Sequence, residues 1–340
     1  GGVIWLIFLL DNSDSYFVYG AEGIPVTRLM IETLTQSLIP ALLVVCIFYS
    51  GEVIWREQRY RFNELIDSMP TPTWVFLLAK LIAIASAIVV LISAATITAV
   101  GFQLFQNYQR LELLLYLKRM SFFALPFIWI TVACFLFQAL AGNRFAGMGL
   151  MLAWLFVLAL LTTFGIQHPL FLYPVGADIP APLSDMNGTG HFMVGGWWER
   201  AYDGAISFLL VLLIYKLWNR GARLPLRARL ATLRGAQTGA FRPTVAAGVL
   251  LALMTGMFVS YNVNVLNSFE SPRRKEELQA RYERDYRRFA SLPMPDTATI
   301  ETEIDLYPTQ LRAEIRSTHQ LINRTDSAID AVHLNFPLRV

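Results

Sequence analysis

Charge is scarce in this chain of 340 residues. Only 16% of the residues are charged, whereas 55% are hydrophobic, and a soluble domain has roughly 25% charged residues. The shortage of charge excludes an ordinary soluble enzyme, and the large hydrophobic share excludes an intrinsically disordered chain. The net charge of +3 is small and the basic residues form no aromatic-lined stripe, so we expect no nucleic-acid partner.

Motifs for catalysis and cofactor binding are also missing. Cys46 and Cys134 both lie in apolar runs, where a packing role is expected rather than a disulfide or a metal site. No G-x-x-x-x-G-K-[ST] phosphate loop occurs, so any ATP would be bound by a separate subunit. The four histidines form no H-E-x-x-H zinc motif. We therefore predict no catalytic, cofactor-binding or metal-binding residue in this chain.

Long apolar runs are what the sequence has instead. A helix needs about 20 mostly apolar residues to cross a membrane. A shorter run at 202–218 is a plausible further span because Lys216 can extend to the interface, and 1–10 looks like the end of another. Lys80 and Glu32, at span ends, are expected to be interfacial anchors. The full-length runs are 33–51, 81–102, 121–143, 145–177 and 243–269.

These runs predict a mostly α fold, a polytopic membrane helix bundle of six spans plus one truncated span. Cytoplasmic loops are enriched in Lys and Arg, and one set of alternate loops carries eleven such residues against five in the other. The strongest signal is 216–242, which has no acidic residue. We therefore expect 216–242 to be cytoplasmic and the segments 166–203 and 261–340 to lie outside. The stretch 111–120 fits either an extension of the next span or an amphipathic surface helix.

The end of the chain has a different composition. Residues 261–340 hold 11 of the 28 basic and 12 of the 25 acidic residues. Ser271 and Pro272 are a good N-cap and first-turn pair for a charged helix reaching about Ala290. Alternating residues then predict a half-buried antiparallel meander with strands near 300–306, 311–321 and 331–336, as the beginning of a β-domain. The predicted domains are a bundle at 1–260, a juxtamembrane helix and linker at 261–298, and an incomplete β-domain at 299–340.

The segment 51–74 joins two predicted spans on the cytoplasmic side. Its mixed charges suit a short helix that docks on a soluble partner, although a helix lying on the lipid surface has the same pattern. The run Trp55-Arg56-Glu57, followed by Asn63-Glu64-Leu65-Ile66-Asp67 and a proline-rich break, resembles permease subunits of ABC-type exporters. In that class this helix is the coupling helix, which contacts a nucleotide-binding ATPase subunit. The resemblance implies the partner-binding residues Trp55, Arg56, Glu57, Arg59, Arg61, Glu64 and Asp67.

More narrowly, the chain is similar to bacterial permeases fused to an extracytoplasmic domain of the aminopeptidase N-like family. The runs Asp305-Leu306-Tyr307-Pro308 and Leu321-Ile322-Asn323-Arg324-Thr325 resemble the first strands of the N-terminal β-domain of these zinc peptidases. Three strands do not form a stable domain alone, so we expect the chain to be an internal fragment of a longer protein. Any zinc and any catalytic domain would then lie beyond Val340, and whether the full protein is an enzyme stays open.

The favoured interpretation is the transmembrane permease part of an ATP-driven ABC exporter, continuing into an extracytoplasmic peptidase-like domain. It implies a multi-pass protein of the bacterial cytoplasmic membrane. Its partners would be the ATPase subunit, the lipid bilayer and the other permease half. Two alternatives are a membrane-anchored zinc aminopeptidase and a non-catalytic sensor or assembly factor.

Overall fold

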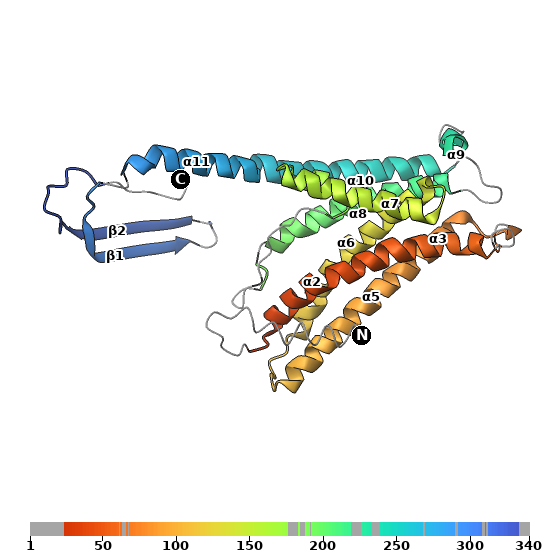
Figure 1. Ribbon diagram of the computed structural model, residues 1–340, viewed down its shortest axis with the longest axis horizontal. Coiled ribbons are helices and arrows are strands. Elements are labelled where there is room, and N and C mark those ends of the chain that lie inside the picture. Colours follow the sequence, from red (N-terminus) through yellow and green to blue (C-terminus); the bar gives the residue numbers. More distant parts are fainter. Residues whose placement is uncertain are drawn as a thin grey trace. The chain divides into compact units, whose positions relative to one another are not determined.

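In the computed structural model, the described residues are mostly helical and include a two-stranded sheet near the C-terminal end (Figure 1). The chain divides into two compact units, Gly1–Ser271 and Pro272–Val340, which are described separately. The structure describes residues 24–60, 62, 66, 68–175, 183, 188–190, 192–218, 226–232, 239–267, 269–289, 292–307, 310 and 312–332.

Long apolar helices build the first unit. A π-helical turn, η2 (Val45–Tyr49), joins the first two helices without a break, and a second one, η4 (Asn262–Leu266), extends the last helix. A short 3-10 turn, η3 (Pro169–Phe171), follows α7. The α-helices are α2 (Thr27–Val44), α3 (Ser50–Arg59), α5 (Thr73–Phe105), α6 (Leu113–Leu140), α7 (Arg144–Thr163), α8 (Phe192–Leu217), α9 (Leu226–Thr232) and α10 (Phe241–Tyr261).

Among the residues that the structure describes, five helices are long and apolar enough to cross a membrane, and they overlap the five full-length apolar runs of the sequence. This confirms the prediction of a mostly helical chain compatible with a membrane. The predicted run 202–218 overlaps α8, which begins earlier, at Phe192, and ends at Leu217. The run 1–10 lies outside the described residues. The five helices are Thr27–Arg59, Thr73–Phe105, Leu113–Leu140, Arg144–Thr163 and Phe241–Leu266.

The stretch 111–120 belongs to a long helix rather than to a separate surface helix, because α6 begins at Leu113. Tyr116 is 2% exposed, and its hydroxyl donates to Gln103 Oε1 of α5 at 2.9 Å. Gln103 Nε2 in turn donates to the Pro25 carbonyl at 2.7 Å. A helix lying on a membrane surface would leave Tyr116 exposed, so this buried contact explains why the stretch continues α6.

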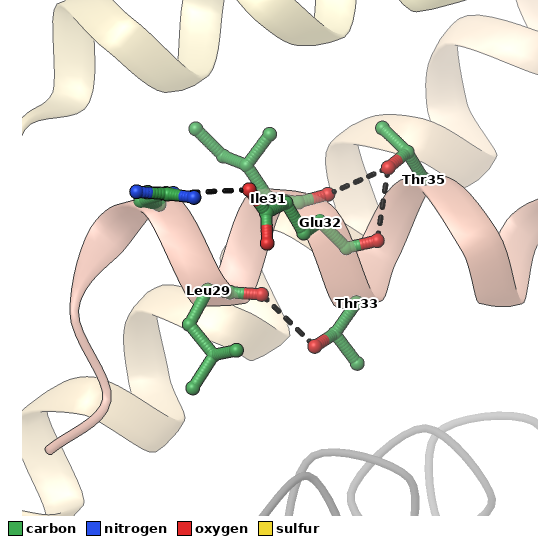
Figure 2. A network of polar contacts seen from close by, with 6 residues as sticks. Leu29, Ile31, Glu32, Thr33 and Thr35 are labelled. Carbon is green, nitrogen blue, oxygen red and sulfur yellow. Dashed lines mark hydrogen bonds and ion pairs between the residues drawn. The ribbon is translucent and has the colours of Figure 1, made fainter. Parts of the chain in front are cut away.

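The first turns of α2 satisfy their own polar groups. Thr33 Oγ1 donates to the carbonyl of Leu29, and Thr35 Oγ1 donates to the carbonyl of Glu32, both at 2.9 Å (Figure 2). Arg28 Nε lies 3.0 Å from Glu32 Oε1, and both side chains are exposed. Because hydroxyls bonded to their own helix need no other partner, these threonines fit an apolar environment. Glu32 is exposed near one end of the helix, and its role as an interfacial anchor stays a prediction.

Asn143 begins α7. Its Oδ1 accepts a hydrogen bond from the Ala146 backbone N–H at 2.8 Å. Loss of such a cap costs about 1 kcal/mol, so Asn143→Ala should lower the apparent melting temperature of the detergent-solubilised protein modestly. A thiol-reactive dye can measure this change. Cys46 and Cys134 form no disulfide and are buried, so the dye reaches them only when the bundle unfolds. Asn143→Asp should keep most of the stability, and an equal loss in that variant would contradict the capping role.

The second unit begins with a helix and ends with a hairpin. Its elements are α11 (Pro272–Tyr286), η5 (Arg287–Phe289), β1 (Asp296–Tyr307) and β2 (Arg312–Ile322). The predicted helix to about Ala290 is confirmed, because helical structure continues through Phe289. Aromatic rings follow one another along this helix. The Tyr282 and Tyr286 ring centroids are 4.6 Å apart, and those of Tyr286 and Phe289 are 6.1 Å apart.

The first two predicted strands pair antiparallel, and the pairing places their alternating residues opposite one another. Ile304 lies opposite Ile315, and Thr302 lies opposite Ser317. The two hydroxyls of the second pair are 2.9 Å apart. Residues that alternate along each strand therefore share one face of the hairpin, since successive side chains point to opposite faces.

The hairpin differs from the prediction in burial and in strand number. Both strands are exposed along their whole length, so the expected half-burial is not found in the second unit as described. Ala331 and Val332 are not in a strand, and 333–336 lie outside the described residues. The predicted three-stranded meander is thus a two-stranded hairpin in the described chain. Burial of one face needs a further layer of structure.

Candidate functional site

The first candidate site is the α3 end of the bundle, where α3 continues the long helix that starts with α2 (Figure 1). Four predicted coupling residues lie on α3, namely Trp55, Arg56, Glu57 and Arg59. The other three, Arg61, Glu64 and Asp67, lie outside the described residues.

Two of the four contact neighbouring helices. Trp55 Nε1 donates to Gln138 Oε1 of α6 at 2.7 Å. Glu57 Oε2 lies 2.8 Å from Lys80 Nζ of α5. These side chains therefore hold α3 against the bundle, which is a role that the sequence pattern did not indicate.

The other two are exposed. Arg56 and Arg59 both lie on the solvent-accessible side of α3. Arg59 Nη1 lies 3.5 Å from Glu52 Oε1, while the second oxygen of Glu52 is 2.7 Å from Arg144 Nη1 at the start of α7. Glu52 thus links α3 to α7. The guanidinium groups of Arg56 and Arg59 remain accessible to a partner.

Gln138 is the centre of the contacts between α3, α6 and α7. It is 2% exposed; its Oε1 accepts from Trp55, and its Nε2 donates to the Arg144 carbonyl at 3.2 Å. A methyl group on Gly147 would overlap the Gln138 amide, and one on Gly51 would lie 3.0 Å from Gln138 Nε2. Glycine at both positions lets α3 and α7 approach the Gln138 side chain closely.

Lys80 is buried rather than exposed at an interface. Its side chain is 8% exposed, and its ammonium lies 5.1 Å from the centroid of the Trp218 ring. Glu57 is close enough for an ion pair, but the contact does not have hydrogen-bond geometry, and Nζ has no hydrogen bond in the part of the chain that the structure describes. The expectation of an interfacial anchor was wrong, because Lys80 is buried against Glu57 and Trp218. Both residues are distant from Lys80 in the sequence, so the local pattern did not indicate this burial.

Together these contacts connect one short helix to three others. α3 reaches α5 through Glu57, α6 through Trp55 and α7 through Glu52. Charge-assisted and buried contacts of this kind resist separation more than exposed ones. A displacement of α3 would therefore move the ends of α5, α6 and α7 with it.

A second polar group of residues, the α8 stripe, consists of Glu199, Asp203 and Ser207. They follow one another at intervals of about one helical turn, and none is more than 2% exposed. Hydropathy alone does not reveal the stripe, because the uncharged apolar run begins only after Asp203. The signal that could have found it is the spacing E-x-x-x-D-x-x-x-S, which places three polar side chains on one helix face.

Residues from two other elements surround the α8 stripe. The Tyr173 hydroxyl lies 2.8 Å from Ser207 Oγ. Burial raises the pKa of the Tyr173 phenol and the Ser207 hydrogen bond offsets this only in part, so the hydroxyl stays neutral. Arg200 Nη1 is 3.5 Å from Asp203 Oδ2, and its guanidinium lies 5.2 Å from the centroid of the Phe122 ring of α6. The stripe is therefore enclosed by protein.

Among the described residues, no group of three His, Cys, Asp or Glu side chains could hold a metal ion. Cys46 Sγ instead contacts the Phe127 carbonyl at 3.3 Å, and Cys134 is buried. No family model, curated protein or solved structure matches this chain.

Proposed function

We propose that the chain is the transmembrane permease part of an ATP-driven exporter and continues into an extracytoplasmic peptidase-like domain. The observation that carries the proposal is the attachment of α3 to α5, α6 and α7 through Glu57, Trp55 and Glu52. An element that transmits a movement must be linked to the helices that it moves. The five membrane-length helices are consistent with the permease part.

The proposal assigns a topology to the bundle. α8 is the sixth span. Its uncharged apolar stretch is shorter than those of the other five helices, because its first half carries charged residues. The basic segment 216–242 and α3 face the cytoplasm, following the excess of Lys and Arg. The segment 261–340 is extracytoplasmic, and the membrane is the bacterial cytoplasmic membrane.

In this function α3 is the coupling helix. A nucleotide-binding ATPase subunit contacts the exposed guanidinium groups of Arg56 and Arg59. Its movement on ATP hydrolysis displaces α3, and the contacts of Glu52, Trp55 and Glu57 pass that displacement to three helices. Substrate then passes between this permease half and the other one.

Reversing the exposed charges tests the assignment. The double variant Arg56→Glu, Arg59→Glu should abolish co-purification with a nucleotide-binding subunit expressed together with the full protein, since an interface rejects charges of the wrong sign. Arg28→Glu is the matched control, because Arg28 is an exposed arginine on the same continuous helix but far from α3. Unchanged co-purification of the double variant would contradict the coupling role.

A further inference from the structure

We propose that Asp203 is a proton-binding residue within the bundle. In this proposal Asp203 holds a proton at neutral pH, and its ionisation at alkaline pH weakens the packing of α8 against α6 and α10. The inference is independent of the proposed export function, because it rests on the α8 stripe and not on α3.

The first argument is the lack of partners for an ionised carboxylate. The Asp203 side chain is 0% exposed. Its Oδ1 has no hydrogen-bond partner in the described ranges, and its Oδ2 is 3.5 Å from Arg200 Nη1, at the outer limit of a hydrogen bond. A buried carboxylate is stable only with several short charge-assisted hydrogen bonds. A neutral carboxylic acid has a much smaller desolvation cost, so this site favours the protonated form.

The second argument is the charge around Asp203. Glu199 is another buried acid, about one turn earlier on the same face of α8. Two ionised carboxylates at this distance repel each other in an interior of low dielectric constant. Arg119 of α6 directs its Nη1 to the sulfur of Met193 at 3.4 Å. The titratable groups that interact with Asp203 are Glu199, Arg200 and Tyr202 on α8 and Tyr173 after α7. Cys134 of α6 interacts in turn with Tyr173.

Cations on the other neighbouring helices are remote. Lys80 of α5 lies beside Trp218, directly after the end of α8. Trp218 is roughly 22 Å from Asp203 along the helix axis, at a rise of 1.5 Å per residue. Arg229 of α9 donates to the Ala139 carbonyl at the end of α6. From α10, Gly256 packs against Tyr202 and brings no charge to the site.

A metal cation fits these surroundings less well than a proton. The guanidinium of Arg200 is adjacent to Asp203 and repels a second cation. Arg200 Nε and Trp129 Nε1 are buried donors without a partner within the described part of the chain, and donors do not coordinate cations. A proton needs neither a cavity nor a set of oxygen ligands.

The helices pack closely around the α8 stripe, so a negative charge on Asp203 should disturb their packing. A methyl group on Gly196 would lie 2.9 Å from the Phe122 ring of α6, and one on Gly256 would lie 3.0 Å from the Tyr202 ring. These approaches leave little room to solvate a new charge at Asp203. Ionisation of Asp203 is therefore expected to loosen the packing of α8 against its neighbours, because the closely packed side chains cannot rearrange to solvate the charge.

Infrared spectroscopy of the full chain in lipid nanodiscs tests the charge state directly. Protein labelled with carbon-13 in the aspartate carboxyl groups should show a carboxylic-acid C=O band at neutral pH that shifts with the label. Asp203→Asn should lose that band. Glu32→Gln is the matched control, because it removes an exposed carboxylate from another membrane helix, and it should keep the band.

The thermal stability of the same samples gives a second readout. A proton held more tightly in the folded state stabilises the protein at low pH, and this contribution is lost as the pH rises through the titration of Asp203. The melting temperature of the native protein should fall as the pH rises from the ordinary acidic range of an aspartate through the titration of Asp203, and it should level off above that titration. Asp203→Asn should remove most of this fall. If Asp203→Asn does not fold, the infrared spectrum of the labelled native protein tests the proposal by itself. A spectrum without a label-sensitive acid band at neutral pH would overturn the proposal, as would sodium-dependent stabilisation with an ionised aspartate.

Discussion

Glu57→Ala is expected to destabilise the bundle strongly, because it leaves the ammonium of Lys80 buried without a counter-charge. Lys80 is 8% exposed and lies beside the Trp218 ring. The cost should be about 2–3 kcal/mol, below the 3–5 kcal/mol of a fully buried pair, because Glu57 is 30% exposed. Unfolding of the detergent-solubilised protein, followed by dye labelling of Cys46 and Cys134, measures the change.

A double variant separates the charge effect from lost packing. Lys80→Met combined with Glu57→Ala removes both charges, and it should recover most of the stability because no buried charge is left unpaired. Glu32→Ala is the control, since Glu32 and Arg28 form an exposed pair that contributes about 0–1 kcal/mol. If Glu57→Ala and Glu32→Ala have equal effects, the buried pair is not a link between α3 and α5.

Gly147→Val is expected to break the contacts that centre on Gln138. A β-carbon at position 147 would overlap the Gln138 amide, so the side chain must leave both Trp55 and the Arg144 carbonyl. Overpacking together with two lost hydrogen bonds should cost about 3 kcal/mol. The same thiol-labelling measurement applies, and the near-ultraviolet signal of the tryptophans should change if Trp55 is released.

Gly149→Val is the matched control for this prediction. Gly149 lies on the same helix, and a β-carbon there meets nothing within 4 Å. Its effect should stay within about 1 kcal/mol, the difference in helix propensity between glycine and ordinary residues. Adding Gln138→Ala to Gly147→Val should restore part of the stability by making room for the valine. Without such a recovery, the overlap with Gln138 is not the cause of the loss.

Local pattern predicted most of the regular structure. The long apolar runs give the five membrane-length helices, because such runs have no stable aqueous conformation and their backbone must bond internally. The helix after Ser271 follows from its cap, its proline and its charged residues. The shared face of Ile304 and Ile315 follows from the period of a strand. Each of these signals lies within one segment of the chain.

Helix ends and burial were not predictable in the same way. α8 begins at Phe192 rather than near 202, because Glu199 and Asp203 are covered by neighbouring helices instead of ending the apolar segment. A hydropathy pattern treats charged residues as exposed, whichever helices cover them in the fold. The half-burial expected for the hairpin failed for the converse reason, because an alternating strand is buried only where another layer covers it.

The sequence by itself determined that this chain is mostly helical, compatible with a membrane, and different in composition after residue 260, since apolar length and charge density act locally. Only the tertiary structure decided which polar residues meet. It turned Trp55 and Glu57 toward Gln138 and Lys80, left Arg56 and Arg59 exposed, and enclosed Asp203. The physical reason is that the effect of a charge depends on its partners and its exposure, and both come from residues distant in the chain.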